Sequence, residues 1–242
     1  MIKIIYIGNS NRVLDLINQS NMFSVDFVIS QKGKLTPRNK RIKYFFVEKK
    51  QEVLEIIRNS DIKIAIMYSF GIILPQEVFN YIEVYNYHPG DLSNNRGSSP
   101  INWAILLNFH KSTMTLHKAN KVIDDGTTVI GSRQCDINKK DTVKSLTIKT
   151  ENLVIPLLKD LNMYLQNNLI SRNEKTGIYR KRIVENDYTI KPLDAKKIIR
   201  AKIQSQKNYF GAICYFRGKK YYIKQYGDYV LLKKKFNIVK KK

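Results

Sequence analysis

Three polar residues, Asn86, His88 and Asp124, have the types that acid-base chemistry needs. Asn86 and His88 are one residue apart at the end of an apolar run, and alternate residues of a strand point to the same face. A histidine accepts a proton near neutral pH, and an amide can donate a hydrogen bond to a developing oxyanion. A carboxylate such as Asp124 would orient the imidazole and stabilise its cationic form. Together these residue types are typical of acyl or formyl transfer.

Other chemistries have weaker support. A histidine at the end of a strand is more often structural than catalytic, so the spacing carries most of the prediction. The chain has no Gly-x-Ser-x-Gly turn, and neither Cys135 nor Cys214 neighbours a histidine, which disfavours a covalent acyl-enzyme. The cysteines also lack the spacing of a metal site, so we expect reduced thiols and no bound metal.

The elements that must position these residues alternate between strand-like and helix-like segments. We expect strands over 3–7, 23–29, 43–47, 62–67 and 84–87, and helices over 12–19 and 51–58. This alternation predicts an α/β fold with a mainly parallel sheet. Ligands of such sheets gather beyond the carboxyl ends of the strands, which is where His88 would lie.

The rest of the catalytic domain is expected to end with a long helix. Pro100 begins a helix, and Asp124 lies in a connection over 118–127. Strands are expected over 113–117 and 128–137, and one helix over 142–166. We therefore predict a catalytic domain over residues 1–170.

Residues 171–242 predict a small C-terminal subdomain. It should contain a short helix over 193–201 and a tyrosine-rich β-hairpin or meander, with 229–232 as its last strand. Such a β-rich segment with exposed tyrosines often pairs between subunits, so we expect a homodimer.

The formal net charge of +23 makes a basic RNA-binding module the alternative from another class of function. The lysines are spread along the chain and are denser only over 32–50 and in the runs 233–235 and 240–242. Such runs are usually solvated, so we expect no nucleic-acid partner. No segment approaches the ~20 apolar residues of a spanning helix, and the N-terminus lacks the features of a signal peptide. We expect a soluble cytoplasmic protein with no membrane partner.

Four consecutive motifs resemble the signatures of the tetrahydrofolate-dependent formyltransferases. They are Asn86-Tyr87-His88-Pro89, Arg96-Gly97-Ser98-Ser99-Pro100-Ile101-Asn102-Trp103-Ala104-Ile105, Thr113-Met114-Thr115-Leu116-His117 and Ile123-Asp124-Asp125-Gly126. The resemblance implies a Rossmann-like formyltransferase core, N10-formyltetrahydrofolate as cosubstrate, and Asn86, His88 and Asp124 as the catalytic triad. It also implies that two segments wall the pterin, with the residues Gly71, Ile72, Ile73, Leu74, Ala119, Asn120 and Val122.

Two loops keep more than one interpretation. From its residues alone, segment 69–75 either caps the core or walls a flat aromatic ligand. Family members commonly carry a Leu-Pro step shortly after the His-Pro pair, whereas this chain has Gly90-Asp91-Leu92-Ser93. The course of residues 90–95 is therefore open at the level of sequence.

Within the family, residues 97–105, 199–201 and 209–212 look most like the sugar N-formyltransferases. This likeness implies a nucleotide-linked amino sugar as acceptor, with dTDP-4-amino-4,6-dideoxyglucose expected, for lipopolysaccharide O-antigen. A methionyl-tRNA formyltransferase usually carries a longer C-terminal part, and a glycinamide ribonucleotide transformylase would leave the C-terminal segment unexplained. The position of the amine, C3 or C4, and the nucleotide stay open.

A nucleotide sugar brings a diphosphate and a flat base, which suit basic and aromatic side chains. The turn after the first strand, with Asn9 and Ser10, could also hold an anion, although an ordinary turn has the same spacing. Candidate substrate ligands are Asn9, Ser10, Arg12, Arg182, Arg200, Lys202, Tyr209 and Tyr222. The simpler interpretation is that the arginines and Lys202 are solvated cations and that the tyrosines pack in the hairpin.

Overall fold

The computed structural model describes residues 1–174 and 177–238. The chain forms two compact units, each built from three separate segments. The first contains Met1–Arg96, Thr113–Gln134 and Thr150–Ile178, and the second contains Gly97–Ser112, Cys135–Lys149 and Tyr179–Lys242. Our predicted domain boundary at residue 170 stays a prediction. Among the described residues, no helix is long and apolar enough to cross a membrane.

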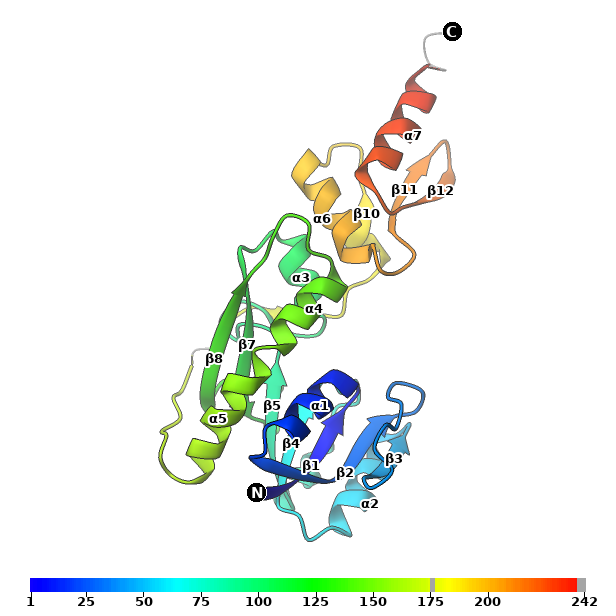
Figure 1. Cartoon of the computed structure of the whole chain (residues 1–242). Coiled ribbons are helices and arrows are strands. Elements are labelled where there is room, and N and C mark those ends of the chain that lie inside the picture. Colours follow the sequence, from blue (N-terminus) through cyan, green and yellow to red (C-terminus); the bar gives the residue numbers. More distant parts are fainter. Residues whose placement is uncertain (175–176, 239–242) are drawn as a thin grey trace. The chain divides into compact units, whose positions relative to one another are not determined.

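A seven-stranded sheet has the strand order β3-β2-β1-β4-β5-β7-β8 (Figure 1). All pairs from β3 to β5 are parallel, and β7 runs antiparallel to β5, so the predicted mainly parallel sheet is confirmed. The chain adds β2 and β3 on one side of β1 and then returns to place β4 on the other side. The strands are β1 Ile2–Gly8, β2 Phe23–Gln31, β3 Lys43–Val47, β4 Ile64–Tyr68, β5 Glu83–His88, β7 Lys111–Lys118 and β8 Val129–Asp136.

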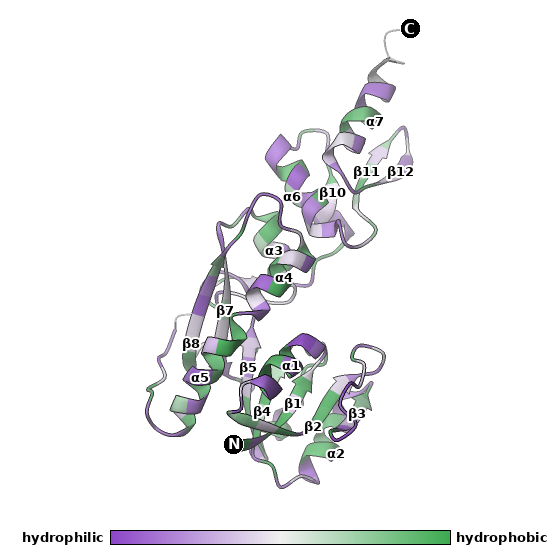
Figure 2. Cartoon of the chain, viewed as in Figure 1, coloured by the Kyte–Doolittle hydropathy of each residue, from purple (hydrophilic) through white to green (hydrophobic). Residues whose placement is uncertain are grey.

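Successive residues of β1 enter different hydrophobic clusters, because neighbouring side chains of a strand point to opposite faces. Ile4 and Tyr6 pack with α1 (Asn11–Gln19) and α5 (Val154–Leu165). Ile5 and Ile7 pack with α2 (Lys50–Arg58) and the 3-10 helix η1 (Gln76–Asn80). The strands β1, β2 and β4 are hydrophobic over most of their length (Figure 2). Burial on both faces explains their continuous apolar runs.

The predicted single helix over 142–166 is wrong, because the chain forms α4 (Val143–Glu151) and then α5. Pro156 lies in the first turn of α5, where a missing backbone N–H costs nothing. In a continuous helix, the same ring would clash with the carbonyl group of Asn152. The break leaves Glu151 at the end of α4.

The described C-terminal part has a three-stranded sheet in the order β10-β11-β12. The predicted hairpin is confirmed: β11 and β12 pair antiparallel around Arg217 and Gly218, which both have positive φ values. The elements of the second unit are α3 Pro100–Leu106, β9 Tyr179–Arg180, η2 Glu185–Tyr188, β10 Thr189–Ile190, α6 Lys196–Gln206, β11 Ala212–Phe216, β12 Lys219–Ile223 and α7 Tyr226–Ile238, with the short strand β6, Arg96–Gly97, at its edge.

The predicted strand over 229–232 is wrong, because these residues belong to α7. Tyr226, Tyr229 and Leu232 recur every three residues, and all three pack against the same C-terminal cluster. That period places side chains on one face of a helix and would scatter them over both faces of a strand. The lysine run 240–242 lies outside the described residues.

Candidate active site

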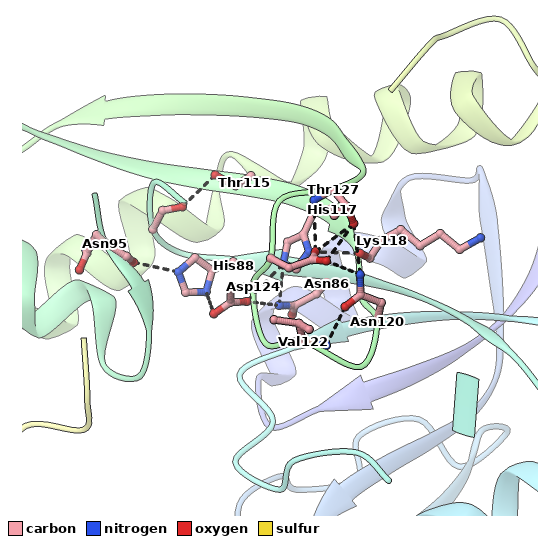
Figure 3. A network of polar contacts seen from close by, with 12 residues as sticks. Asn86, His88, Asn95, Thr115, His117, Lys118, Asn120, Val122, Asp124 and Thr127 are labelled. Atoms are coloured by element: carbon pink, nitrogen blue, oxygen red, sulfur yellow. Dashed lines mark hydrogen bonds and ion pairs between the residues drawn. The ribbon is translucent and has the colours of Figure 1, made fainter. Parts of the chain in front are cut away.

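The fold brings Asn86, His88 and Asp124 together within the first unit (Figure 3). Asn86 and His88 lie on β5, and Asp124 lies in the connection between β7 and β8. The Asp124 Oδ2 atom lies 3.4 Å from His88 Nδ1, and its Oδ1 atom lies 3.3 Å from Asn86 Nδ2. The geometry places an acid-base pair beside an amide, and the catalytic role of these residues stays a prediction.

The connection that carries Asp124 is shaped by its own polar side chains. Asp124 has a left-handed backbone with φ 50°, and its side chain is buried. Asn120 donates to Asp125 and to Thr127 Oγ1, and its Oδ1 atom accepts from the Val122 backbone N–H at 2.7 Å. Asn120 therefore folds the loop that presents the carboxylate.

The hydrogen bonds of His88 indicate which ring nitrogen can act as a base. Nε2 lies 3.0 Å from the Asn95 carbonyl oxygen, which can only accept, so Nε2 carries the hydrogen. The Nδ1 atom is then the basic nitrogen and faces Asp124. Burial lowers the pKa of His88, and this effect outweighs the nearby Asp124 and the Asn95 carbonyl group, which raise it. A neutral His88 can therefore accept a proton at Nδ1.

The loop over residues 90–95, which the sequence left open, packs directly against His88. A Cβ atom at Gly90 would lie 2.3 Å from the Asn95 carbonyl oxygen and 2.6 Å from His88 Nε2. Thr115 Oγ1 on β7 donates to the Gly90 carbonyl oxygen at 2.8 Å. Gly90 thus permits the close approach that orients the imidazole.

His117 is a site residue that our sequence analysis did not select. It pairs with Asn86 across β5 and β7, and its Nε2 atom lies 3.1 Å from Asn86 Nδ2 and 3.3 Å from Asp124 Oδ1. The available signals were its place at the end of the predicted strand 113–117, seven residues before Asp124, and its membership of the third family-like motif. Without the strand order, those signals do not show which residue His117 faces.

His117 helps to set the orientation of the Asn86 amide. Its Nδ1 atom lies 3.4 Å from the Lys118 carbonyl oxygen, which favours a hydrogen on Nδ1 and a lone pair on Nε2. Asn86 Nδ2 then donates one hydrogen to His117 and the other to Asp124. The amide is held by two partners before any substrate arrives.

The segments 71–74 and 119–122, which are expected to wall the pterin, both follow strands of the seven-stranded sheet and both carry apolar side chains. Leu74 and Ala119 pack with one hydrophobic cluster, whereas Ile73 and Val122 leave 68% and 57% of their surface exposed. Exposed apolar side chains on loops beside a buried polar group suit a flat ring with a polar edge. These residues therefore fit a pterin.

Two predicted substrate ligands of the first turn contact Glu151. Ser10 Oγ donates to Glu151 Oε1 at 2.8 Å, and Arg12 Nε lies 3.6 Å from Glu151 Oε2. Arg12 also donates to Asn152. Burial raises the pKa of Glu151, although Ser10, Arg12 and Tyr68 lower it. These contacts join the N-terminus of α1 to the end of α4.

Apart from Asn9, which lies in the first unit, the other predicted ligands belong to the second unit. Arg182 is exposed, Arg200 lies over the Tyr226 ring at 5.0 Å, and Tyr209 is exposed. Tyr222 lies 6.4 Å from the Phe210 ring centroid. Lys202 is buried and donates to Asp194 at 2.6 Å, so it holds the fold together. The substrate contacts of the four remaining side chains stay predictions.

The described residues contain no group of three or more His, Cys, Asp or Glu side chains that could hold a metal ion. Both cysteines are free thiols. Burial raises the pKa of the Cys214 thiol to about 11. A thiol with such a pKa is protonated at neutral pH and is a weak nucleophile.

Residues 3–157 match the family model described as formyl transferase. This chain belongs to the formyl transferase family. The match covers the sheet of the first unit, with Asn86, His88 and Asp124, and it confirms the family resemblance of the motifs.

Similar proteins were found by sequence and by structure. The methionyl-tRNA formyltransferase of Buchnera aphidicola from Schizaphis graminum is 29% identical over 144 residues, which are 57% of this chain and 46% of that protein. The chain therefore spans about half the length of that relative. Among solved structures, a 4-N formyltransferase from Francisella tularensis has a TM-score of 0.78 and 17% identity, covering 93% of this chain and 97% of that one.

Two further structures share the fold. A sugar N-formyltransferase from Shewanella has a TM-score of 0.74 and 19% identity, covering 93% of this chain and 97% of that one. HypX from Aquifex aeolicus, in complex with tetrahydrofolic acid, has a TM-score of 0.71 and 16% identity, covering 90% of this chain and 36% of that one. The TM-scores establish a shared Rossmann-like formyltransferase fold. At identities this low, the likeness shows the fold alone.

Proposed function

We propose that this protein is an N-formyltransferase that uses N10-formyltetrahydrofolate as formyl donor. The observation that carries the proposal is the buried pair of His88 and Asp124 beside the partly buried Asn86, within a formyl transferase domain. The apolar surface of segments 71–74 and 119–122 supports folate as the donor, as does the tetrahydrofolate bound to HypX.

The residues of the site divide the work of amine formylation. When bound, the folate cosubstrate supplies a formyl carbon that an amine can attack. His88 Nδ1 accepts the proton that the amine loses, and Asp124 stabilises the imidazolium that forms. Asn86 donates from Nδ2 to the formyl oxygen as negative charge develops there. His88 and Asp124 then pass the proton to the nitrogen that loses the formyl group.

This mechanism requires one exchange of hydrogen bonds at Asn86. Both Nδ2 hydrogens point to His117 and Asp124 before substrate binds. The contact to Asp124, at 3.3 Å, is the longer of the two, so it is the one that we expect the amide to exchange for the formyl oxygen. A protonated His88 would compensate Asp124 for that loss.

We propose a nucleotide-linked amino sugar as acceptor, with dTDP-4-amino-4,6-dideoxyglucose expected and the product destined for lipopolysaccharide O-antigen. The support is the closeness of the fold: the TM-scores are 0.78 and 0.74 for the Francisella and Shewanella structures, of which 97% is covered, and 0.67 for a methionyl-tRNA formyltransferase from Clostridium thermocellum, of which 90% is covered. We also propose a homodimer formed through the tyrosine-rich C-terminal part.

The amino group of methionyl-tRNA is the second candidate acceptor. Its support is the sequence similarity to methionyl-tRNA formyltransferases, together with the net charge of +23, which suits a polyanionic substrate. Both candidates are primary amines, so the triad serves either one.

Incubation with N10-formyltetrahydrofolate and a panel of dTDP- and UDP-linked amino sugars tests the proposal. We expect one sugar to gain the mass of a formyl group, with the His88→Asn variant as the inactive control. Formylation of charged initiator tRNA, with no sugar modified, would exchange the ranking of the acceptors. Absence of any formylated amine, with no folate bound, would reject the proposed activity.

A further inference from the structure

Asn9 links the ends of three strands at the point where the strand order reverses. Its Nδ2 atom donates to the Ser69 carbonyl oxygen at 2.7 Å and to Gln31 Oε1 at 2.8 Å. Its Oδ1 atom accepts from Ser30 Oγ at 2.9 Å and from the Gln31 backbone N–H at 3.0 Å. The network therefore joins the carboxyl ends of β1 and β2 to the residue that follows β4.

These four hydrogen bonds use the full capacity of the Asn9 side chain, because an amide has two hydrogens to donate and two lone pairs. Asn9 therefore has no donor or acceptor left for a diphosphate. Its role as a substrate ligand stays a prediction from the sequence, and the network points to a different role.

Gln31 extends the network to the segment that follows β4. Its Oε1 atom accepts from the Gly71 backbone N–H at 2.8 Å as well as from Asn9. A Cβ atom at Gly71 would lie 2.7 Å from that oxygen, so the backbone approaches Gln31 as closely as a glycine allows. Ser69 has a φ of 53°, a strained value for this residue type, and its carbonyl group is held by Asn9.

We infer that Asn9 and Gln31 are positioning residues that hold segment 69–74 in the shape that receives the pterin. The inference rests on the proposed function, because it takes this segment as a wall of the folate site. A loop that is already ordered loses little conformational freedom when the ligand binds, so the same contacts give tighter binding. Without the network, the free backbone groups of Ser69 and Gly71 would let the segment move.

The chemistry of the network predicts opposite outcomes for two substitutions of similar size. Gln31→Glu retains an oxygen that can accept from both Gly71 and Asn9, so it should behave like the wild type. Asn9→Asp replaces the donor by an oxygen that faces the Ser69 carbonyl oxygen and Gln31 Oε1, so it should disrupt the segment. Gln31→Met removes the acceptor while keeping most of the volume.

Steady-state kinetics and direct folate binding test the inference. In Asn9→Asp and Gln31→Met, we expect the KM for N10-formyltetrahydrofolate and the Kd for tetrahydrofolate to rise by about 5- to 30-fold. We expect kcat, the KM for the acceptor and the acidic limb of the pH profile to change little. Gln76→Ala, an exposed glutamine close to the same segment, is the matched control, and Gln31→Glu should preserve wild-type values.

The outcomes separate this inference from the proposed function. A wild-type protein that binds no folate and formylates no amine would reject both, since the segment would have no pterin to receive. Wild-type folate binding together with unchanged KM and Kd in Gln31→Met and Asn9→Asp would overturn the inference alone. Equal weakening by Gln31→Glu and Gln31→Met would also overturn it, because the acceptor oxygen would then be irrelevant.

Discussion

The carboxylate of Asp124 lies 3.4 Å from the Nδ1 atom of His88, and the two side chains keep only 6% and 5% of their surface exposed. The separation exceeds the ~2.7–2.9 Å of a strong charge-assisted hydrogen bond. This separation suits a resting state in which His88 is neutral. The carboxylate can form the stronger bond once His88 becomes an imidazolium. Burial strengthens the interaction once the proton arrives, because the local dielectric is low.

Removing either member of this pair should abolish most of the activity without unfolding the protein. A positioned general base contributes ~10²–10⁴ in rate, so His88→Asn and Asp124→Asn should each lower kcat by about that factor. Since the residues act as a unit, the double variant should be little worse than either single variant. Formylation kinetics with circular dichroism as the fold control check this, and near-normal turnover of His88→Asn would contradict the assignment.

The pH dependence of kcat/KM should show an acidic limb set by His88. Burial holds the pKa of His88 below its ordinary value of about 6.5, and only the neutral form accepts the amine proton. Activity should therefore stay high as pH falls through 6.5 and decline only at lower pH. The limb should vanish from the residual activity of His88→Asn. Since the free acceptor amine also titrates in kcat/KM, the decisive comparison is kcat at saturating substrates, and an acidic limb of kcat that persists unchanged in His88→Asn would argue against this base.

Gly90→Ala should impair catalysis through the orientation of His88. The new methyl group would collide with the Asn95 carbonyl oxygen and the imidazole, and only a shift of the loop could relieve both contacts. Misplacement of a catalytic group by about 1 Å can cost ~10²-fold in kcat. Gly227→Ala, in α7 with open space around it and no left-handed backbone, is a control for the loss of a glycine. Equal kcat values for the two variants would remove the proposed role of Gly90.

The sequence predicted the parts of the site that depend on local pattern. The alternation of Asn86 and His88 placed both side chains on one face of β5, and the apolar runs of β1 to β5 predicted a parallel sheet. What could not be predicted depends on strand order and on contacts between distant loops. His117 faces Asn86 only because β7 pairs with β5, and Asn9 meets Gln31 only because β1 lies beside β2.

The two errors of secondary structure have physical causes. Pro156 is tolerated in the first turn of a helix and disfavoured in its interior, so it was a signal for a new helix start near residue 154 that the apolar pattern of 142–166 outweighed in our prediction. In α7, the run Tyr229 to Leu232 is apolar enough for a strand, and the deciding residue, Tyr226, lies outside that run. A short stretch of sequence does not show a helical period when the residues that define the period extend beyond the stretch.

The buried Glu151 should make stability depend on pH. Its pKa in the folded state lies above the ordinary value of 4.5, so the folded state binds more protons than the unfolded state in the interval between the two values. This contribution to stability is present below pH 4.5 and is lost as pH rises through the folded pKa. Glu151→Gln should remove this pH dependence of the unfolding free energy. Denaturant titrations at several pH values measure it. The same slope in both proteins would show that Glu151 does not cause it.

His117 should act on catalysis through the Asn86 amide. His117→Ala removes the acceptor of one Nδ2 hydrogen, so the amide can rotate, and kcat should fall by about 10²-fold. His117→Gln offers a side-chain oxygen to the same hydrogen and should recover part of the loss. His88 keeps its own partners in both variants, so the acidic limb of kcat/KM should persist. It should move to higher pH in His117→Ala, because the nearby His117 helps to lower the pKa of His88. A limb that disappears in His117→Ala would make His117, and not His88, the group that accepts the proton.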